Sequence, residues 1–362
     1  MLFELALQLI DGVGPVTARN LVSVFGNAEA VFTAPVSQLR QVAGVSPKVI
    51  KEIRARTVFD RAEQECRFME KHKVCAISFT DPDYPRQLRF CEDSPPLLFY
   101  RGSVPLTAPR MVAIVGTRAV GEYGSSVCAA IIRELAPYQP VIVSGLALGT
   151  DTVAHRTALE CGIPTIATLA HGLDRVYPSQ NRKLAAAIEE NGALITELLS
   201  GTQPDRENFP KRNRIVAGLS QATIVIESGT KGGSMITARL AFDYNRDVFA
   251  VPGRLTDQSY SGNNKLIAAN QAAMFLSVED LVKQLGWDGP KPQPVQRSMF
   301  NELSETGKQL VGYLAERQLG QLDDMSLDLQ LTISRLNAEL MDLELKGLVR
   351  AYPGKKFSLL AF

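Results

Sequence analysis

Short apolar runs separated by amphipathic stretches occupy the middle of the chain from about residue 74. Runs of this kind are typical of buried strands, and the stretches between them suit right-handed crossover helices. The pattern therefore predicts an α/β fold in which a parallel sheet carries helices on both faces. The predicted strands are 74–78, 111–116, 141–144, 165–169, 193–196, 223–227, 248–251 and 273–276.

The first sixty residues contain an internal repeat with an offset of 32 residues, which aligns Gly12 with Gly44 and Pro15 with Pro47. Each copy predicts a helix, a tight glycine turn and a second helix that begins with proline, where the missing N–H costs nothing. The repeat thus predicts a pair of helix-hairpin-helix units, a SAM-like helical module. Two interpretations stay open: the turns bind DNA phosphate through backbone N–H groups, or the glycines only turn the chain.

A proline-rich stretch after Gly286 predicts a linker, because neither a helix nor a central strand tolerates alternating prolines. Beyond it, 303–316 and 332–346 have a helical period and 348–360 predicts a hairpin, which together indicate a winged helix. Helix 332–346 carries more acidic than basic residues, so a protein partner or weak DNA contact is at least as well supported as duplex reading. The predicted domains are 1–70 (helical module), 71–286 (sheet domain), 287–298 (linker) and 299–362 (winged-helix module).

Composition narrows the function classes. The net charge of +1 means that any site for a polyanion must be a local patch. The five cysteines are widely spaced without a C-x-x-C pair, which predicts neither a disulfide framework nor a metal site. No apolar run is long enough to span a membrane and the first residues do not resemble a signal peptide, so a cytoplasmic location is expected.

The first chemical motif, 114–124, follows a predicted strand and opens a helix. Its Gly116 and Thr117 allow backbone N–H groups to approach an anion, and Arg118 adds a bidentate donor for phosphate. Neither G-x-G-x-x-G nor the P-loop pattern is present, which disfavours a dinucleotide cofactor and a nucleoside triphosphatase, and no cofactor is expected. A second strand end carries Asp151 with His155 four residues later, interpreted as a helix N-cap and an interior histidine.

The most informative cluster is 208–218, interpreted as a basic loop that enters a helix. Between residues 210 and 240 five basic residues face one acid, so this stretch is locally +4. Phe209 offers a ring on which a base can stack while the cations follow the phosphates. Lys231, Gly232 and Gly233 form a further glycine turn at the start of a helix.

Taken together and in order, these motifs resemble the DprA/Smf family of DNA-processing proteins, over nearly the whole chain. The resemblance implies an extended Rossmann-like sheet domain, homodimerisation, cooperative binding of single-stranded DNA, and loading of a RecA-type recombinase during natural transformation, without enzymatic activity. The predicted DNA contacts are Gly116, Thr117, Arg118, Ser144, Gly145, Lys183, Phe209, Lys211, Arg212, Asn213, Arg214, Lys231, Gly232 and Gly233.

The last segment of the sheet domain, 265–276, is apolar and nearly uncharged. A last strand tends to lie at a sheet edge, so Ile267 and Met274 are predicted to lie at the dimer interface, with Leu266 and Phe275 in the core.

Two other functions are kept as alternatives. Glu227 with the glycines at 232 and 233 faintly resembles the motif of Rossmann-like nucleotide phosphoribohydrolases, which would make the chain an enzyme. Alternatively, the chain is a recombinase partner in which the winged helix carries the recognition and DNA contact is incidental.

Overall fold

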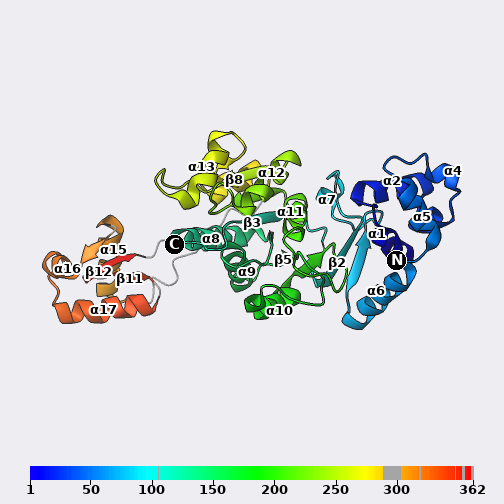
Figure 1. Cartoon of the computed structure of the whole chain (residues 1–362). Helices are drawn as coiled ribbons and strands as arrows, with labels where there is room; N and C mark the ends of the chain where they lie inside the picture. The colour runs from blue at the N-terminus through cyan, green and yellow to red at the C-terminus, as the bar shows by residue number, and fades with distance from the viewer. Residues whose placement is uncertain (105, 288–302, 318, 347, 353–354, 360–362) are drawn as a thin grey trace. The chain divides into compact units, whose positions relative to one another are not determined.

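The computed structural model describes residues 1–104, 106–287, 303–317, 319–346, 348–352 and 355–359. The chain forms two compact units, Met1–Gly289 and Pro290–Phe362 (Figure 1). Trp287, expected to begin the linker, is buried in the first unit, where its indole N–H donates to Gln221 Oε1 over 3.0 Å. The rest of the predicted linker, 288–298, lies outside the described residues.

The N-terminal module of the first unit is helical, as its repeat predicts. Its helices are α1 (Leu2–Leu9), α2 (Pro15–Phe25), α3 (Ala28–Thr33), α4 (Val36–Leu39), α5 (Pro47–Ala55) and α6 (Phe59–His72). Pro15 and Pro47 each occupy the first position of a helix, and the turns before them contain glycines with left-handed backbone, Gly12 at φ 89° and Gly44 at φ 84°.

Each hairpin packs its turn against the second helix of the other. A Cβ atom on Gly12 would lie 3.1 Å from Val49, and one on Gly44 would lie 2.9 Å from Thr17. These contacts are equivalent under the 32-residue repeat, so each turn faces the second helix of the other hairpin. Lys48 adds an exposed ion pair with Asp11 across the same surface.

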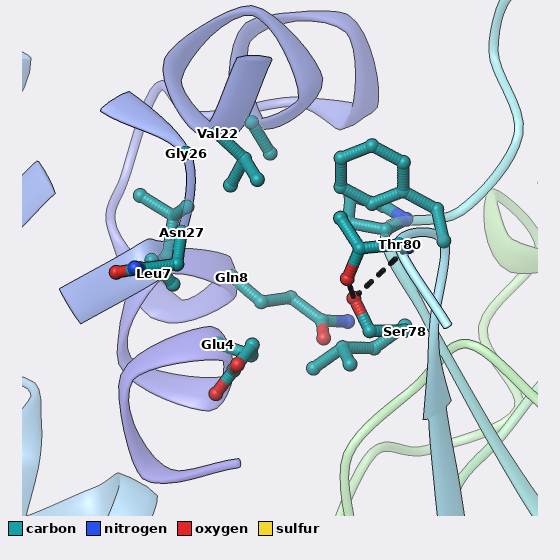
Figure 2. Close-up of a pocket in the computed structure, with 13 residues that line it drawn as sticks. Glu4, Leu7, Gln8, Val22, Gly26, Asn27, Ser78 and Thr80 are labelled. Carbon is teal, nitrogen blue, oxygen red and sulfur yellow. Dashed lines mark hydrogen bonds between the residues drawn. The ribbon is translucent and has the colours of Figure 1, made fainter. Parts of the chain in front are cut away.

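The helical module is joined to the sheet by side chains that donate to backbone carbonyls. Arg19 donates to the carbonyl oxygens of Cys91 and Glu92 over 2.8 and 3.0 Å, and Gln8 donates to that of Glu197 over 2.7 Å. Figure 2 shows Gln8 extending from α1 toward Ser78, across a small cavity of about 40 Å³. This cavity is too small for a nucleotide, so a nucleic-acid site must be sought elsewhere.

One sheet of nine strands forms the rest of the first unit, in the order β1-β2-β6-β5-β4-β3-β7-β8-β9. The pairs from β6 to β9 are parallel, whereas β2 pairs antiparallel with both β1 and β6. The strands are β1 (Cys75–Ser78), β2 (Leu97–Gly102), β3 (Met111–Val115), β4 (Val141–Ser144), β5 (Thr165–Thr168), β6 (Ala193–Thr196), β7 (Ala222–Val225), β8 (Asp247–Ala250) and β9 (Ala273–Met274).

All the predicted strands are present within two residues of their predicted ends. β2 was not among the predicted strands, so the antiparallel edge of the sheet was not predicted either. β2 is a short apolar segment with prolines before and after it, a pattern that also suits a loop. Its strand state depends on pairing with β6, a distant segment that the local sequence does not indicate.

Helices cover both faces of the sheet, as expected for the predicted α/β class. α8 (Glu122–Leu135), α9 (Thr150–Glu160) and α14 (Val278–Gln284) share one apolar cluster with the sheet, and α11 (Asn208–Leu219) and α12 (Gly233–Asp243) share the other (Figure 1). The other helices of this part are α7 (Arg86–Arg89), α10 (Arg182–Asn191) and α13 (Ser261–Ala268).

The second unit is a winged helix, as predicted. Its described elements are α15 (Glu305–Arg317), β10 (Gly320–Gln321), α16 (Leu322–Asp328), α17 (Ile333–Leu345), β11 (Val349–Tyr352) and β12 (Lys356–Leu359), with strand order β10-β12-β11. The sequence analysis missed β10 and α16, which are short. On α17, Leu336, Leu340 and Leu343 are buried, whereas Met341 and Leu345 are exposed.

Candidate nucleic-acid interface

The carboxyl ends of β3, β4 and β7 bring three glycine turns to one edge of the sheet. Gly116 follows β3, Gly145 follows β4, and Gly232 precedes α12 after β7. They surround a pocket of about 370 Å³, which is large enough for a nucleotide. The pocket is lined by Val115, Gly116, Thr117, Arg118, Gly145, Ala147, Asp151, Phe209, Arg212, Asn213, Val216, Ser228, Gly229, Gly232, Gly233, Ser234 and Thr237.

The turn before α12 presents the N-terminus of a helix to the pocket. Gly232 is the N-cap of α12 and Gly233 its first residue. The Gly232 N–H donates to the Gly229 carbonyl and the Met235 N–H to the Gly232 carbonyl, each over 3.1 Å, so Gly233 and Ser234 supply the N–H groups that an anion can meet. No atom lies within 4 Å of the place where a Cβ on Gly233 would stand, which leaves the backbone open to the pocket. Lys231 is exposed directly beside this turn.

The predicted basic loop is the start of a helix instead, because α11 begins at Asn208. Pro210 lies in the first turn, where its missing N–H breaks no helical bond, so the proline that suggested a loop is compatible with a helix. As a consequence the cations of this run point in different directions. Lys211 is exposed, while Asn213 is half-buried and donates to the Gly233 carbonyl over 3.3 Å.

Arg212 forms the floor of the pocket rather than its rim. Its side chain is 6% exposed, and Nη1 donates to the Thr168 carbonyl over 3.1 Å. It approaches β4 so closely that a Cβ on Gly145 would lie 1.5 Å from Nη1, which only glycine allows. Burial lowers the pKa of Arg212, and the neighbouring Asp151 carboxylate opposes this by favouring the charged form.

Asp151 is the buried counter-charge of Arg212. It lies in the first turn of α9, but the N-cap residue is Gly149, which corrects the prediction that Asp151 caps the helix. Its Oδ2 accepts N–H bonds from Gly145 and Ala147 over 3.2 and 3.1 Å, and so fixes the β4 turn. Burial raises its pKa, against the opposing effects of Arg212 and these N–H groups.

His155 is an interior residue, as expected. Its Nδ1 lies 2.7 Å from Thr165 Oγ1, whose own proton is donated to the Ile142 carbonyl, so Nδ1 carries the hydrogen and Nε2 does not. Burial lowers the pKa of His155 to about 3, and the Arg212 charge adds to the effect. The imidazole is therefore neutral at physiological pH.

Two predicted contacts lie in the protein interior instead of facing the pocket. Arg214 is buried, forms an ion pair with Glu197 and donates to the Asp93 carbonyl, so its guanidinium is not available to a phosphate. Ser144 is fully buried, and its hydroxyl donates to the Ile114 carbonyl over 2.6 Å. In both cases the residue type can bind phosphate, but the side chain points into the protein interior.

Arg118 and Phe209 meet at the rim of the pocket. The Arg118 guanidinium lies over the Phe209 ring, 5.2 Å from its centroid, and is exposed to solvent. Tyr177, which was not among the predicted contacts, packs against Phe209, with ring centroids 6.2 Å apart. Lys183 is exposed in the first turn of α10 and does not line the pocket.

Several lining residues went unpredicted, among them Ala147, Ser228, Gly229, Ser234 and Thr237. Ser234 donates to Ser228 over 2.7 Å and so ties the β7 turn to the start of α12. A signal existed for Ser228 and Gly229, since they follow a strand just as Thr117 and Gly145 do.

The residues predicted at the dimer interface lie near the sheet edge formed by β9. Met274 is exposed and Ile267 is half-buried, while Leu266 is buried and Phe275 packs on Phe249. Exposed Leu276 enlarges this apolar surface.

Among the residues that the structure describes, no group of three or more His, Cys, Asp or Glu side chains could hold a metal ion. Within the same residues, no helix has the length and apolar character needed to cross a membrane.

Three protein-family models match the chain. Residues 75–286 match DNA recombination-mediator protein A, residues 3–56 match a SAM-like helix-hairpin-helix tandem, and residues 301–355 match the DprA winged helix domain. These matches coincide with the three folded parts described above.

Similar proteins cover most of the chain. Protein Smf from Synechocystis sp. is 33% identical over 98% of this chain and 98% of its own length. The X-ray structure of DNA processing protein A from Streptococcus pneumoniae has a TM-score of 0.68 at 32% identity, covering 78% of this chain and 98% of that one. A structure of DNA processing protein A from Helicobacter pylori, described for its single-stranded DNA binding mode, has a TM-score of 0.54 at 32% identity, covering 60% and 98%.

Proposed function

The chain belongs to the DprA/Smf family of DNA-processing proteins, and on this basis we propose that it binds single-stranded DNA with little sequence preference and loads a RecA-type recombinase onto it. We place this activity in natural transformation, in the cytoplasm. The single-stranded DNA binding mode described for the Helicobacter pylori relative supports the choice of ligand.

The observation that carries the proposal is the convergence of three glycine turns and Arg118 on one open pocket. Backbone N–H groups and a guanidinium address phosphate, which is common to every nucleotide, so they give affinity without reading sequence. We propose the N–H groups of Gly116 and Gly233 as the backbone contacts. Thr117, Gly145 and Gly232 shape the turns instead, because their N–H groups donate to the Glu227 carbonyl, Asp151 Oδ2 and the Gly229 carbonyl. The cationic and polar contacts are Arg118, Lys183, Lys211, Asn213 and Lys231, with Phe209 at the rim and Arg212 as a buried positive charge beneath the phosphates.

We propose binding rather than hydrolysis because Glu227, the acid on which the phosphoribohydrolase alternative depends, is turned away from the pocket. Its carboxylate accepts the Gly121 N–H over 3.0 Å and the Tyr260 hydroxyl over 3.3 Å, and it does not line the pocket. The acid that does line it, Asp151, is committed to Arg212 and two N–H groups.

The test is a titration of the purified full-length protein with oligonucleotides of equal length, single- and double-stranded, over a salt series. Four exposed cations contacting four phosphates predict that log K falls against log salt with a slope of about −3. A flat salt response, or a strong preference for one base composition, contradicts the proposal. Nucleotide hydrolysis that disappears in Asp151→Ala would favour the enzyme.

We also propose a homodimer formed through Ile267 and Met274 near the β9 edge. A two-fold pairing there joins two pockets into one longer track, which makes binding cooperative through effective concentration. Ile267→Arg is expected to give monomers by light scattering and to weaken binding to long oligonucleotides more than to short ones. A wild-type monomer at micromolar concentration contradicts this interface.

A further inference from the structure

An aromatic pair extends the rim of the pocket beyond the residues that line it. Tyr177 and Phe209 have ring centroids 6.2 Å apart and planes inclined at 64°, an edge-to-face contact. Phe209 lines the pocket, whereas Tyr177 is in contact with Phe209 but does not line the pocket itself. The rim therefore continues from the phosphate-binding turns onto a second ring.

The two rings differ in how much of their surface is free. The Arg118 guanidinium lies over the Phe209 ring at 5.2 Å, so one face of that ring already has a cationic partner. Phe209 is also only partly exposed, in the first turn of α11. Tyr177 is 45% exposed and has no cation over its ring among the described residues.

The main chain of Tyr177 is held by a buried histidine. His171 is 1% exposed; its Nδ1 donates to the Gly172 carbonyl over 2.9 Å, which leaves Nε2 to accept the Tyr177 N–H over 3.2 Å. Burial lowers the pKa of His171, which favours the neutral form that this arrangement needs. Asn181 joins the end of the same loop to the β4 turn by donating to the Leu146 carbonyl over 2.9 Å.

An exposed aromatic ring on a fixed main chain, with its edge against a second ring, is suited to stacking. Fixing the main chain in advance lowers the entropy that ordering it on binding would cost. The nearby turns bind phosphate, so a nucleotide whose phosphate enters the pocket can place its base outside, at the rim.

We propose that Tyr177 is a base-stacking residue, on which an unpaired nucleobase rests while its sugar-phosphate backbone follows the glycine turns. The proposal rests on the proposed function and deepens it, because it supplies a contact that duplex DNA cannot make. Bases in a duplex are stacked on one another and do not present a free face to a side chain at the backbone. Phosphate contacts hold either form, and Tyr177 selects the single strand.

The experiment compares two single-stranded oligonucleotides of equal length, one with bases and one made of abasic sites, in the full-length protein. Tyr177→Ala is expected to weaken binding of the base-bearing strand by about 5- to 150-fold and to leave binding of the abasic strand unchanged. Tyr177→Phe keeps the ring and is expected to bind both strands like the wild type. Phe90→Ala is the matched control, since Phe90 is a 73% exposed aromatic residue that does not line the pocket.

Each other outcome has a distinct meaning. If Tyr177→Ala weakens both strands equally, or neither, Tyr177 is not a stacking residue, although phosphate binding stands. If the alanine variant melts early, Tyr177→Leu keeps apolar contact with Phe209 without a π face, and the same comparison decides. If the wild-type protein binds neither strand, the proposed function itself is wrong and the stacking proposal falls with it.

Discussion

The helix-hairpin-helix module and the pocket edge use the same backbone device for different ends. Both place a glycine turn before the first residue of a helix, which is the arrangement that favours anions. In the module, Gly12 and Gly44 are packed against the opposite hairpin, and the neighbouring Lys48 is paired with Asp11. Gly14, the N-cap of α2, has open space around it, but its neighbouring cation is already paired. At the pocket, the space above Gly233 is open and Arg118 and Lys231 are exposed.

The comparison teaches that a glycine turn indicates a phosphate site only when its N–H side is free and cations stand beside it. Of the two interpretations of the hairpin repeat, the reciprocal packing of its turns favours a packing module. Two other contacts of the module also favour a packing role. Arg19 and Gln8 donate hydrogen bonds to backbone carbonyls of the sheet domain.

The largest effect is expected from Arg212→Ala, which breaks the floor of the pocket. The substitution leaves Asp151 as an uncompensated buried charge, so the free energy of unfolding should fall by about 3–5 kcal/mol in urea denaturation. Lys211→Ala, one residue away and exposed, should leave it unchanged within about 0.5 kcal/mol. Equal stability of the two variants would mean that Arg212 is not a structural residue.

Arg118→Ala should sharpen the contrast in binding. Losing a charge-assisted phosphate contact worth about 1.5–3 kcal/mol weakens single-stranded DNA binding about 10- to 150-fold, with no change in melting temperature. Lys48→Ala in the hairpin module is the control and should bind like the wild type, as measured by fluorescence anisotropy. A comparable loss in Lys48→Ala would show that the module contacts DNA after all.

The two regions should also respond differently to acid. The folded pKa of His155 is about 3, below its unfolded value of about 6.5, so the folded state binds fewer protons between these pH values. Its stabilisation is complete above pH 6.5 and declines as the pH falls, by about 2 kcal/mol between pH 6.5 and 5. His155→Gln should flatten this part of the stability profile. The exposed Asp11–Lys48 pair should contribute little to it.

The smallest effects come from a matched pair of glycine substitutions. Gly44→Ala places a Cβ on a left-handed residue and against Thr17, so it should lower the free energy of unfolding by about 1–2 kcal/mol without changing DNA affinity. Gly233→Ala meets no neighbour and has an ordinary helical position, so it should keep the stability and weaken binding by placing a methyl group over the phosphate site. If instead Gly44→Ala weakened DNA binding and Gly233→Ala lowered the stability, the hairpin turn would be the DNA contact and the pocket turn the packing contact.

Most strands and helices were predictable from the sequence because a buried strand or an amphipathic helix has a hydrophobic pattern within its own residues. The 32-residue repeat and the proline at each second helix were enough to identify the hairpins. β2 was not predictable, since its position between β1 and β6 depends on a pairing distant in the chain.

At the candidate site, the sequence identified the glycine turns and Arg118 but not which cations face the pocket. Lys211, Arg212 and Arg214 are near neighbours on one helix, yet one is exposed, one forms the pocket floor and one is paired with Glu197 in the interior. Residue type indicates what a side chain can bind, whereas the direction of the side chain depends on its place around the helix. That direction was not predicted because the start of α11 was taken for a loop. Tyr177 was missed because a lone tyrosine in a loop carries no signal until Phe209 is seen beside it.

The antiparallel pairing of β2 with β6 bears on how the protein is made. The ribosome releases β2 long before β6, so Tyr100 has no sheet partner on that side until Ile195 emerges. A two-stranded hairpin of β1 and β2 is only marginally stable by itself, and an open edge invites pairing with another chain. Nascent chains that stall before residue 193 therefore carry an unprotected strand, and we expect them to depend on chaperones that the finished protein does not need.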